Sequence, residues 1–245
     1  MPFSNCYEDA ARAAAYSQLE FANTYYLAYR DLPAIIGEHA RGNAAVDFGC
    51  GTGRSTRFLR QLGFEVVGVD ISPQMIAKAR ELDPAGDYRL IANGNLAESV
   101  GPRTRDLVLS AFTFDNVPGP ERKVELLREL AALLKSGGKI VNLVSTPEIY
   151  VHEWASFSTK DYPENRRAQS GDIVRIVSTE LPDTRPVEDI LWTDESYRAV
   201  HEEAGLRVLA TYRPMATGEE PYAWVNETKI APWVIYVLGH VSQGR

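Results

Sequence analysis

The sequence predicts an α/β fold with a mostly parallel sheet and helices on both of its faces. From residue 44 onward, short apolar runs alternate with helical patterns, which is typical of parallel strands joined by crossover helices. The length of 245 residues suits one large α/β domain, so we expect residues 1–245 to form a single domain. Hydrophobic types make up 44% and charged types 24%, which is ordinary for globular proteins and argues against disorder.

Apolar runs mark the expected strands of this sheet. The parallel strands are predicted at residues 44–48, 65–69, 87–91, 106–110 and 139–144. Two further runs, at 206–213 and 233–238, predict two final strands joined by a long loop that contains Pro and Gly.

Helix signals separate these strands. A capping serine followed by proline predicts a helix over 73–82. The longest helical pattern, at roughly 119–135, has one apolar stripe and is expected to end at a Gly-Gly pair. A third helix is predicted to begin near Thr193, with acidic residues in its first turn, and to end at Gly205.

Two regions are expected to cover the sheet. Residues 1–42 are rich in Ala and Tyr and indicate an N-terminal helical cover. Residues 147–192 hold aromatic side chains among polar ones, and the alternating runs 172–179 and 187–192 predict a β-hairpin inserted after the fifth strand. We expect this insertion to cap the ligand-binding side of the domain.

Charge and composition exclude several functions. The 33 acidic and 26 basic residues give a formal net charge of −7, and no Lys- or Arg-rich block would follow a phosphate backbone, so nucleic acid is not an expected partner. No run reaches the ~20 apolar residues of a membrane span, and no secretory signal is apparent. Cys6 and Cys50 are too few for a disulfide framework. These features predict a cytoplasmic protein without a membrane partner.

The candidate cofactor site follows the first strand. Asp47 is followed by Gly49, Gly51 and Gly53 at alternate positions, before the next helix. Glycine lets the backbone turn sharply and approach a ligand without a Cβ collision, and a helix N-terminus offers free N–H groups. Asp70 ends the second strand, where a carboxylate can accept both hydroxyl groups of a ribose. Together these residues predict a nucleoside ligand, although glycines after a strand can also be simple turn formers.

The glycine spacing distinguishes between nucleoside cofactors. Dinucleotide-binding loops carry G-x-G-x-x-G, whereas the third glycine comes one residue early here. The carboxylate of Asp47, two positions before the first glycine, would repel a pyrophosphate but suits an ammonium group. S-adenosylmethionine has an ammonium group, a ribose diol and no phosphate, so it is the predicted cofactor.

These segments resemble the class I S-adenosylmethionine-dependent methyltransferases. The resemblance rests on VDFGCGTGRSTRFL (46–59), GVDISPQMIAKAR (68–80), IANGN (91–95), DLVLSAFTFDNVP (106–118) and LLKSGGKIV (134–141), in that order. It implies a Rossmann-like, seven-stranded sheet of order 3-2-1-4-5-7-6 in which strand seven is antiparallel. The two final predicted strands supply the sixth and seventh.

The resemblance also implies roles in cofactor binding. Asp47 and the glycines would border the methionine moiety, and Asp70 would hold the ribose. The other implied cofactor residues are Ile71, Met75, Asn93, Gly94 and Asn95 around the adenine, and Ser110 and Phe112 beside the sulfonium. The family often has an acidic residue near the adenine amino group, and this chain has asparagines there, which leaves the identity of that contact open.

Methyl transfer requires an acceptor lone pair in line with the methyl group and the departing sulfur, so alignment in a dry pocket is the main requirement. Asp115 and His152 are the candidate bases. Asp115 has an alternative role as a helix cap, and a lone loop histidine such as His152 is more often structural. Asn116, Tyr25 and Trp154 are candidate substrate contacts, unless the insertion aromatics only pack on the sheet.

Tyr26 and Arg30 form a candidate lid over the cofactor. If the chain is helical from Thr24, these two residues face the same way at i,i+4 spacing, and Arg30 would pair with the cofactor carboxylate.

The predicted reaction is methylation of a nitrogen or oxygen of a small-molecule acceptor, by a monomer or homodimer. The aromatic residues of the insertion favour an apolar or cationic acceptor. No metal is expected, because His152 lacks a second histidine four residues on. The alternatives are a nicotinamide-dependent oxidoreductase on a similar scaffold and a non-catalytic subunit that binds S-adenosylmethionine.

Overall fold

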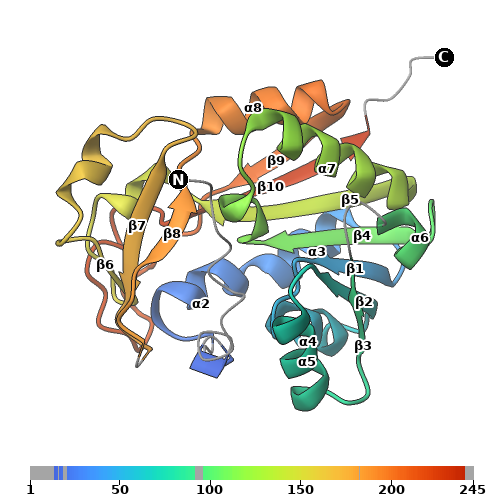
Figure 1. The fold of residues 1–245 in the computed structure, drawn as a ribbon, viewed down its shortest axis with the longest axis horizontal. Coiled ribbons are helices and arrows are strands. Elements are labelled where there is room, and N and C mark those ends of the chain that lie inside the picture. The colour runs from blue at the N-terminus through green and yellow to red at the C-terminus, as the bar shows by residue number, and fades with distance from the viewer. Residues whose placement is uncertain (1–13, 16, 19–20, 92–95, 182, 241–245) are drawn as a thin grey trace.

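The structure, a computed structural model, describes residues 14–15, 17–18, 21–91, 96–181 and 183–240 (Figure 1). Its main sheet is seven-stranded, in the order β3-β2-β1-β4-β5-β10-β9. The strands are β1 (Ala44–Phe48), β2 (Glu65–Asp70), β3 (Asp87–Leu90), β4 (Arg105–Ala111), β5 (Leu134–Ser145), β9 (Leu206–Tyr212) and β10 (Trp233–His240). Strands β1 to β5 pair in parallel, and β10 is antiparallel to both of its neighbours. The predicted fold class and strand order are therefore confirmed.

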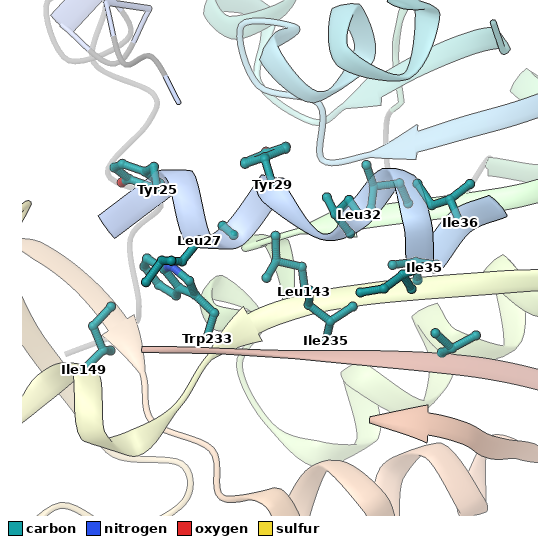
Figure 2. Close-up of a cluster of buried hydrophobic side chains, with 14 of the residues drawn as sticks. Tyr25, Leu27, Tyr29, Leu32, Ile35, Ile36, Leu143, Ile149, Trp233 and Ile235 are labelled. Atoms are coloured by element: carbon teal, nitrogen blue, oxygen red, sulfur yellow. The ribbon is translucent and has the colours of Figure 1, made fainter. Parts of the chain in front are cut away.

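Helices cover both faces of this sheet (Figure 1). The helices are α2 (Asn23–Arg30), α3 (Leu32–His39), α4 (Arg54–Gln61), α5 (Pro73–Leu82), α6 (Leu96–Val100), α7 (Pro120–Leu133) and α8 (Asp194–Glu203). Successive strand residues face opposite sides, so Ala45 and Val46 of β1 enter different clusters. One cluster joins the sheet to α2 and α3 (Figure 2), and the other joins it to α7 and α8. Burial of each large apolar side chain in such a layer contributes about 1.5–3 kcal/mol.

The helix starts follow the sequence signals. The Ser72 side chain accepts a hydrogen bond from the backbone N–H of Met75 at the start of α5, and Thr193 caps α8 in the same way through Ser196. The predicted end of α7 at the Gly-Gly pair is wrong. Strand β5 begins at Leu134, directly after α7, because Leu134 pairs with Arg105 of β4.

The insertion after β5 contains short 3-10 helices and a small sheet of order β6-β7-β8. Its elements are η3 (Pro147–Tyr150), β6 (Phe157–Ser158), η4 (Pro163–Arg167), β7 (Ile173–Ser178) and β8 (Val187–Ile190). Strands β7 and β8 pair antiparallel, with Ile173 opposite Ile190, which confirms the predicted hairpin. The insertion lies at the end of the main sheet toward which β4 points (Figure 1), so it stands over the carboxyl ends of the parallel strands.

No helix in the described ranges has both the length and the apolar character needed to cross a membrane.

Candidate active site

A cavity of about 790 Å³ lies at the carboxyl ends of the central strands. Open α/β sheets bind ligands in this position, where the strand order reverses. The cavity runs from the loops after β1 and β2, past the 3-10 helix η2 (Thr113–Asn116) after β4, to the inner side of the insertion. The predicted cofactor loop and the predicted acceptor cap thus border one continuous space.

The glycine loop forms one wall of the cavity. Gly49, Gly51 and Gly53 have φ values of +72°, +52° and +83°, a region that side chains rarely adopt. A Cβ on Gly49 would lie 2.1 Å from Oγ1 of Thr113, so this position is also sterically closed. Gly49 and Gly51 line the cavity, whereas Gly53 packs against the ring of Tyr88. The loop therefore has a conformation that only glycine accommodates easily, at the surface where a ligand would lie.

Asp70 is fixed beside this loop. One carboxylate oxygen accepts a hydrogen bond from the N–H of Gly51, and the other accepts from the N–H of Ser72, both at 2.8 Å. Burial raises the pKa of Asp70 above its ordinary value. Asp70 lines the cavity, and a carboxylate has about four lone-pair sites, so both oxygens can still accept from the hydroxyl groups of a ribose.

Asp47 has an unsatisfied oxygen next to the glycine loop. Its Oδ2 accepts from the hydroxyls of Ser55 (2.7 Å) and Thr56 (2.6 Å), whereas its Oδ1 has no hydrogen-bond partner among the described residues. Burial raises the pKa of Asp47 to about 6. Asp47 does not line the cavity itself, and neither does Ser110, whose hydroxyl is also buried without a partner in the described chain. An orphaned carboxylate oxygen at this position suits a cationic ligand group.

Ile71, Met75 and Phe112, for which adenine and sulfonium contacts are predicted, all line the cavity. Phe112 has a φ of +64°, which is strained for a bulky residue and is often seen at functional sites. Its ring packs 4.8 Å from that of Trp233. The predicted contacts of Asn93, Gly94 and Asn95 lie outside the described residues.

Tyr26 and Arg30 contact each other as predicted, but neither lines the cavity. The guanidinium carbon of Arg30 lies 6.0 Å from the Tyr26 ring centroid, and the guanidinium is held by Asp31 (2.7 Å) and Glu220 (3.0 Å). The Tyr26 ring packs on Tyr222. The predicted lid over the cofactor therefore faces the loop between β9 and β10 instead.

A different cation approaches the glycine loop. Arg54, the first residue of α4, places its guanidinium carbon 4.6 Å from the ring centroid of Tyr25, and Tyr25 lines the cavity. Its charge also acts on the Asp47 carboxylate, where it opposes the burial-driven rise in pKa. Sequence reasoning missed Arg54, although it directly follows the last glycine of the loop.

Asp115 lies where η2 meets the end of β5. Its carboxylate accepts hydrogen bonds from the backbone N–H (3.1 Å) and hydroxyl (2.8 Å) of Ser145, and from the hydroxyl of Tyr197 (3.2 Å). It does not cap α7, whose first position is preceded by Gly119. Burial raises the pKa of Asp115. Both Asp115 and Asn116 line the cavity.

A second carboxylate, Asp189 of β8, lies near Asp115 on the insertion side of the cavity. Asp189 lines the cavity and accepts a hydrogen bond from the hydroxyl of Tyr150 at 3.1 Å. Burial, and after it the charge of Asp115, raises the pKa of Asp189 to about 8. Lys123 is fully buried nearby, donates to the carbonyl of Phe114, and has a pKa lowered by burial.

His152 and Trp154 lie away from the main cavity. His152 lines a separate hollow of about 320 Å³ on the insertion. Trp154 is buried, and its indole N–H donates to the carbonyl of Ile149 at 2.9 Å. The structure thus gives Trp154 a packing role within the insertion and does not bring His152 to Asp115.

Comparison with known proteins agrees with this geometry. A family model described as a methyltransferase domain matches residues 46–142. The chain is 28% identical over 229 residues to trans-aconitate 2-methyltransferase of Mycobacterium ulcerans, covering 87% of this chain and 76% of that protein. It is 34% identical over 114 residues to an uncharacterized methyltransferase of Geobacillus, covering 46% of this chain and 52% of the relative, so it spans about half of that relative's length.

Solved structures share the fold. The CcbJ methyltransferase from Streptomyces caelestis aligns with a TM-score of 0.65 and 17% identity, over 94% of this chain and 96% of that one. An S-adenosylmethionine-dependent methyltransferase from Clostridium acetobutylicum aligns with a TM-score of 0.62 and 13% identity, over 96% and 99%. The chain has the fold of the class I S-adenosylmethionine-dependent methyltransferases, and its residues 46–142 match a methyltransferase domain.

The residues of this site fit S-adenosylmethionine, the cofactor of the proteins that share the fold. Asp70 has acceptor capacity for a ribose diol, the glycine loop has no side chains in the way, and the orphaned Oδ1 of Asp47 suits an ammonium group. No residue group in the described chain has the composition of a metal site.

Asp189 is a cavity residue that sequence reasoning missed. The alternating segment 187–191 places it in phase with Val187 and Leu191, on the apolar side of the strand, whereas Glu188 pairs outward with Arg175. An acidic residue on the apolar side of a strand was the available signal.

Proposed function

We propose that this methyltransferase transfers a methyl group from S-adenosylmethionine to a nitrogen or oxygen atom of a small-molecule acceptor. The observation that carries this proposal is the single cavity that joins Asp70 and the glycine loop to the buried polar groups of Asp115 and Asp189. A cofactor at one end and an acceptor at the other would meet near η2, between the two walls.

The bound cofactor would supply an electrophilic methyl group on a sulfonium. The chain's own contribution is alignment, because the acceptor lone pair must point at the methyl carbon opposite the sulfur. Phe112, Tyr25 and Trp233 form an aromatic wall of the cavity, which would disfavour water beside it. Alignment of this kind can lower the barrier by about 7–11 kcal/mol.

A small acceptor is supported by the shape and charge of the site. The insertion covers the strand ends, so the acceptor end lies between β7, β8 and the main sheet. The formal net charge of −7 disfavours a polyanionic acceptor such as nucleic acid.

Binding of S-adenosylhomocysteine to the whole chain, measured by calorimetry, tests the cofactor half of the proposal. We expect saturable binding, and a loss of about tenfold or more in Asp70→Asn, because the neutral amide weakens acceptance from the ribose hydroxyls. Asp87→Asn is the matched control, since Asp87 is an exposed acid at the start of β3. Saturable binding of a nicotinamide dinucleotide, with none of S-adenosylhomocysteine, would show instead an oxidoreductase site.

A further inference from the structure

We propose that the acceptor atom is an amine nitrogen, and that Asp189 binds the ammonium form and takes its proton before methyl transfer. This inference rests on the proposed function and specifies its acceptor class. It comes from the arrangement of charge at the insertion end of the cavity.

The position of Asp189 connects the insertion to the cofactor end. Strand β8 contacts η2, which directly follows β4. The first residue of η2, Thr113, donates its hydroxyl to the carbonyl of Phe48 at the end of β1 (2.9 Å). The last, Asn116, lines the cavity and hydrogen-bonds with Asp189. The 3-10 helix η2 therefore links the end of β1 to Asp189, and both border the same cavity.

The charged groups around Asp189 include more carboxylates than cations. It is faced by Asp115 from η2, Tyr150 from η3, Tyr197 from α8 and Lys123 from α7. Two carboxylates thus share one buried ammonium group, and the ammonium of Lys123 also donates to the Phe114 carbonyl. Without a ligand this shortfall is met by a proton on Asp189, because burial raises its pKa to about 8. A ligand that brings a cation can displace that proton and pair with the carboxylate.

The rest of the cavity wall favours the same ligand. Among the described residues that line it, Arg122 is the sole cation, and it pairs outward with Glu125 at 3.1 Å. The rings of Tyr25, Tyr150 and Trp233 line the cavity, and aromatic faces attract a desolvated cation. A carboxylate acceptor, like the one for which the Mycobacterium relative is named, would lie against two acidic side chains, and the buried Lys123 that these share does not line the cavity.

An ammonium group must lose a proton before it can accept a methyl group. The raised pKa of Asp189 makes its carboxylate a stronger base than an ordinary aspartate. The N–H proton passes to the carboxylate, and the freed nitrogen lone pair forms the new N–C bond. The C–S bond breaks with its electron pair staying on sulfur, so the sulfonium becomes a neutral thioether and the product carries the positive charge. The proton on Asp189 returns to solvent when the product leaves.

The test uses the whole chain saturated with S-adenosylhomocysteine and three probes of one skeleton: 2-phenylethylamine, 2-phenylethanol and phenylacetate. We expect calorimetry to show the amine binding about tenfold or more tightly than the other two. Asp189→Asn is expected to remove this preference, while Glu188→Gln retains it, because Glu188 pairs with Arg175 outside the cavity.

Other outcomes overturn the amine assignment. These are an alcohol or carboxylate that binds as well as the amine, no saturable binding of the amine, or a preference that survives in Asp189→Asn. The ranking of the probes on the unaltered chain decides the question even if the variant does not fold. Failure of S-adenosylhomocysteine itself to bind would instead contradict the proposed function, so the two failures are distinguishable.

Discussion

Single residues of the cofactor loop were predictable because their signal is local. Asp47, the glycines and Asp70 follow two strands directly, and the strands themselves place them at one edge of the sheet. Arg30 was not predictable, because its partner Glu220 is 190 positions away in the chain and no local pattern indicates the pair. The same holds for Asp189, whose hydrogen-bond partner Tyr150 comes from another part of the insertion.

At the residue scale, we predict that Arg54 and not Arg30 supports the methionine end of the cofactor. The Arg54 guanidinium acts on the Asp47 carboxylate and lies over Tyr25, whereas Arg30 is held by Asp31 and Glu220 away from the cavity. Arg54→Ala is expected to weaken S-adenosylhomocysteine binding about tenfold, or about 1.4 kcal/mol.

Arg30→Ala is the matched control for this prediction and is expected to change the affinity less than about twofold. Calorimetry at equal ionic strength gives both values, and circular dichroism verifies that each variant is folded. If the two variants lose equal affinity for S-adenosylhomocysteine, the prediction that Arg54 and not Arg30 supports the cofactor is wrong.

At the scale of elements, most helices and strands followed from periodicity and capping, but their ends depend on tertiary pairing. The glycines at 137 and 138 carry a helix-stop signal, yet they lie inside β5 because its first residue already pairs with β4. The β7–β8 hairpin was predictable from alternation, but its position over the strand ends was not, since that depends on contacts between β8 and η2.

Strand β8 carries a buried carboxylate that should reduce stability at alkaline pH. The pKa of Asp189 is about 8 in the folded chain and about 3.9 in an unfolded one, so the folded state holds a proton that the unfolded state has released. The stability contributed by that proton is complete below about pH 4 and is lost as the pH rises through 8.

We therefore expect Asp189→Asn to raise Tm relative to the unaltered chain near pH 9, with the difference shrinking toward pH 5. Each kcal/mol corresponds to about 2–4 °C for a domain of this size. Glu188→Gln on the same strand is the control. Thermal unfolding followed by circular dichroism at both pH values measures the effect, and a Tm difference independent of pH would contradict the assigned titration. If Asp189→Asn gains stability and also loses amine binding, Asp189 shows the trade-off between stability and activity that is typical of functional sites.

At the scale of the whole molecule, the parallel sheet was predictable because each strand is a continuous apolar run in a fixed order. The cavity was not predictable as a unit, since its walls come from α2, the strand-end loops and the insertion. Glu227, fully buried in the loop between β9 and β10, joins two of these parts, α2 and the insertion. Its carboxylate accepts from the hydroxyl of Thr24 and the N–H of Ala155, both at 2.7 Å, and from the N–H of Val225 at 2.8 Å.

Because one carboxylate holds α2, the insertion and the β9–β10 loop together, its removal should loosen the cap as a unit. Hydrogen bonds to charged groups contribute about 1.5–3 kcal/mol each, and each kcal/mol corresponds to about 2–4 °C, so the loss of three such bonds in Glu227→Ala is expected to lower Tm by roughly 9 °C or more. Hydrogen exchange should become faster in peptides around residues 24, 155 and 225, with little change in α7. Glu219 is an exposed acid of the same loop, and Glu219→Ala should alter neither Tm nor the exchange rates.

Since the glycine loop and Asp70 lie outside this network, S-adenosylhomocysteine binding should persist in Glu227→Ala. Faster exchange confined to the β9–β10 loop would show that the three segments do not depend on Glu227 to stay together.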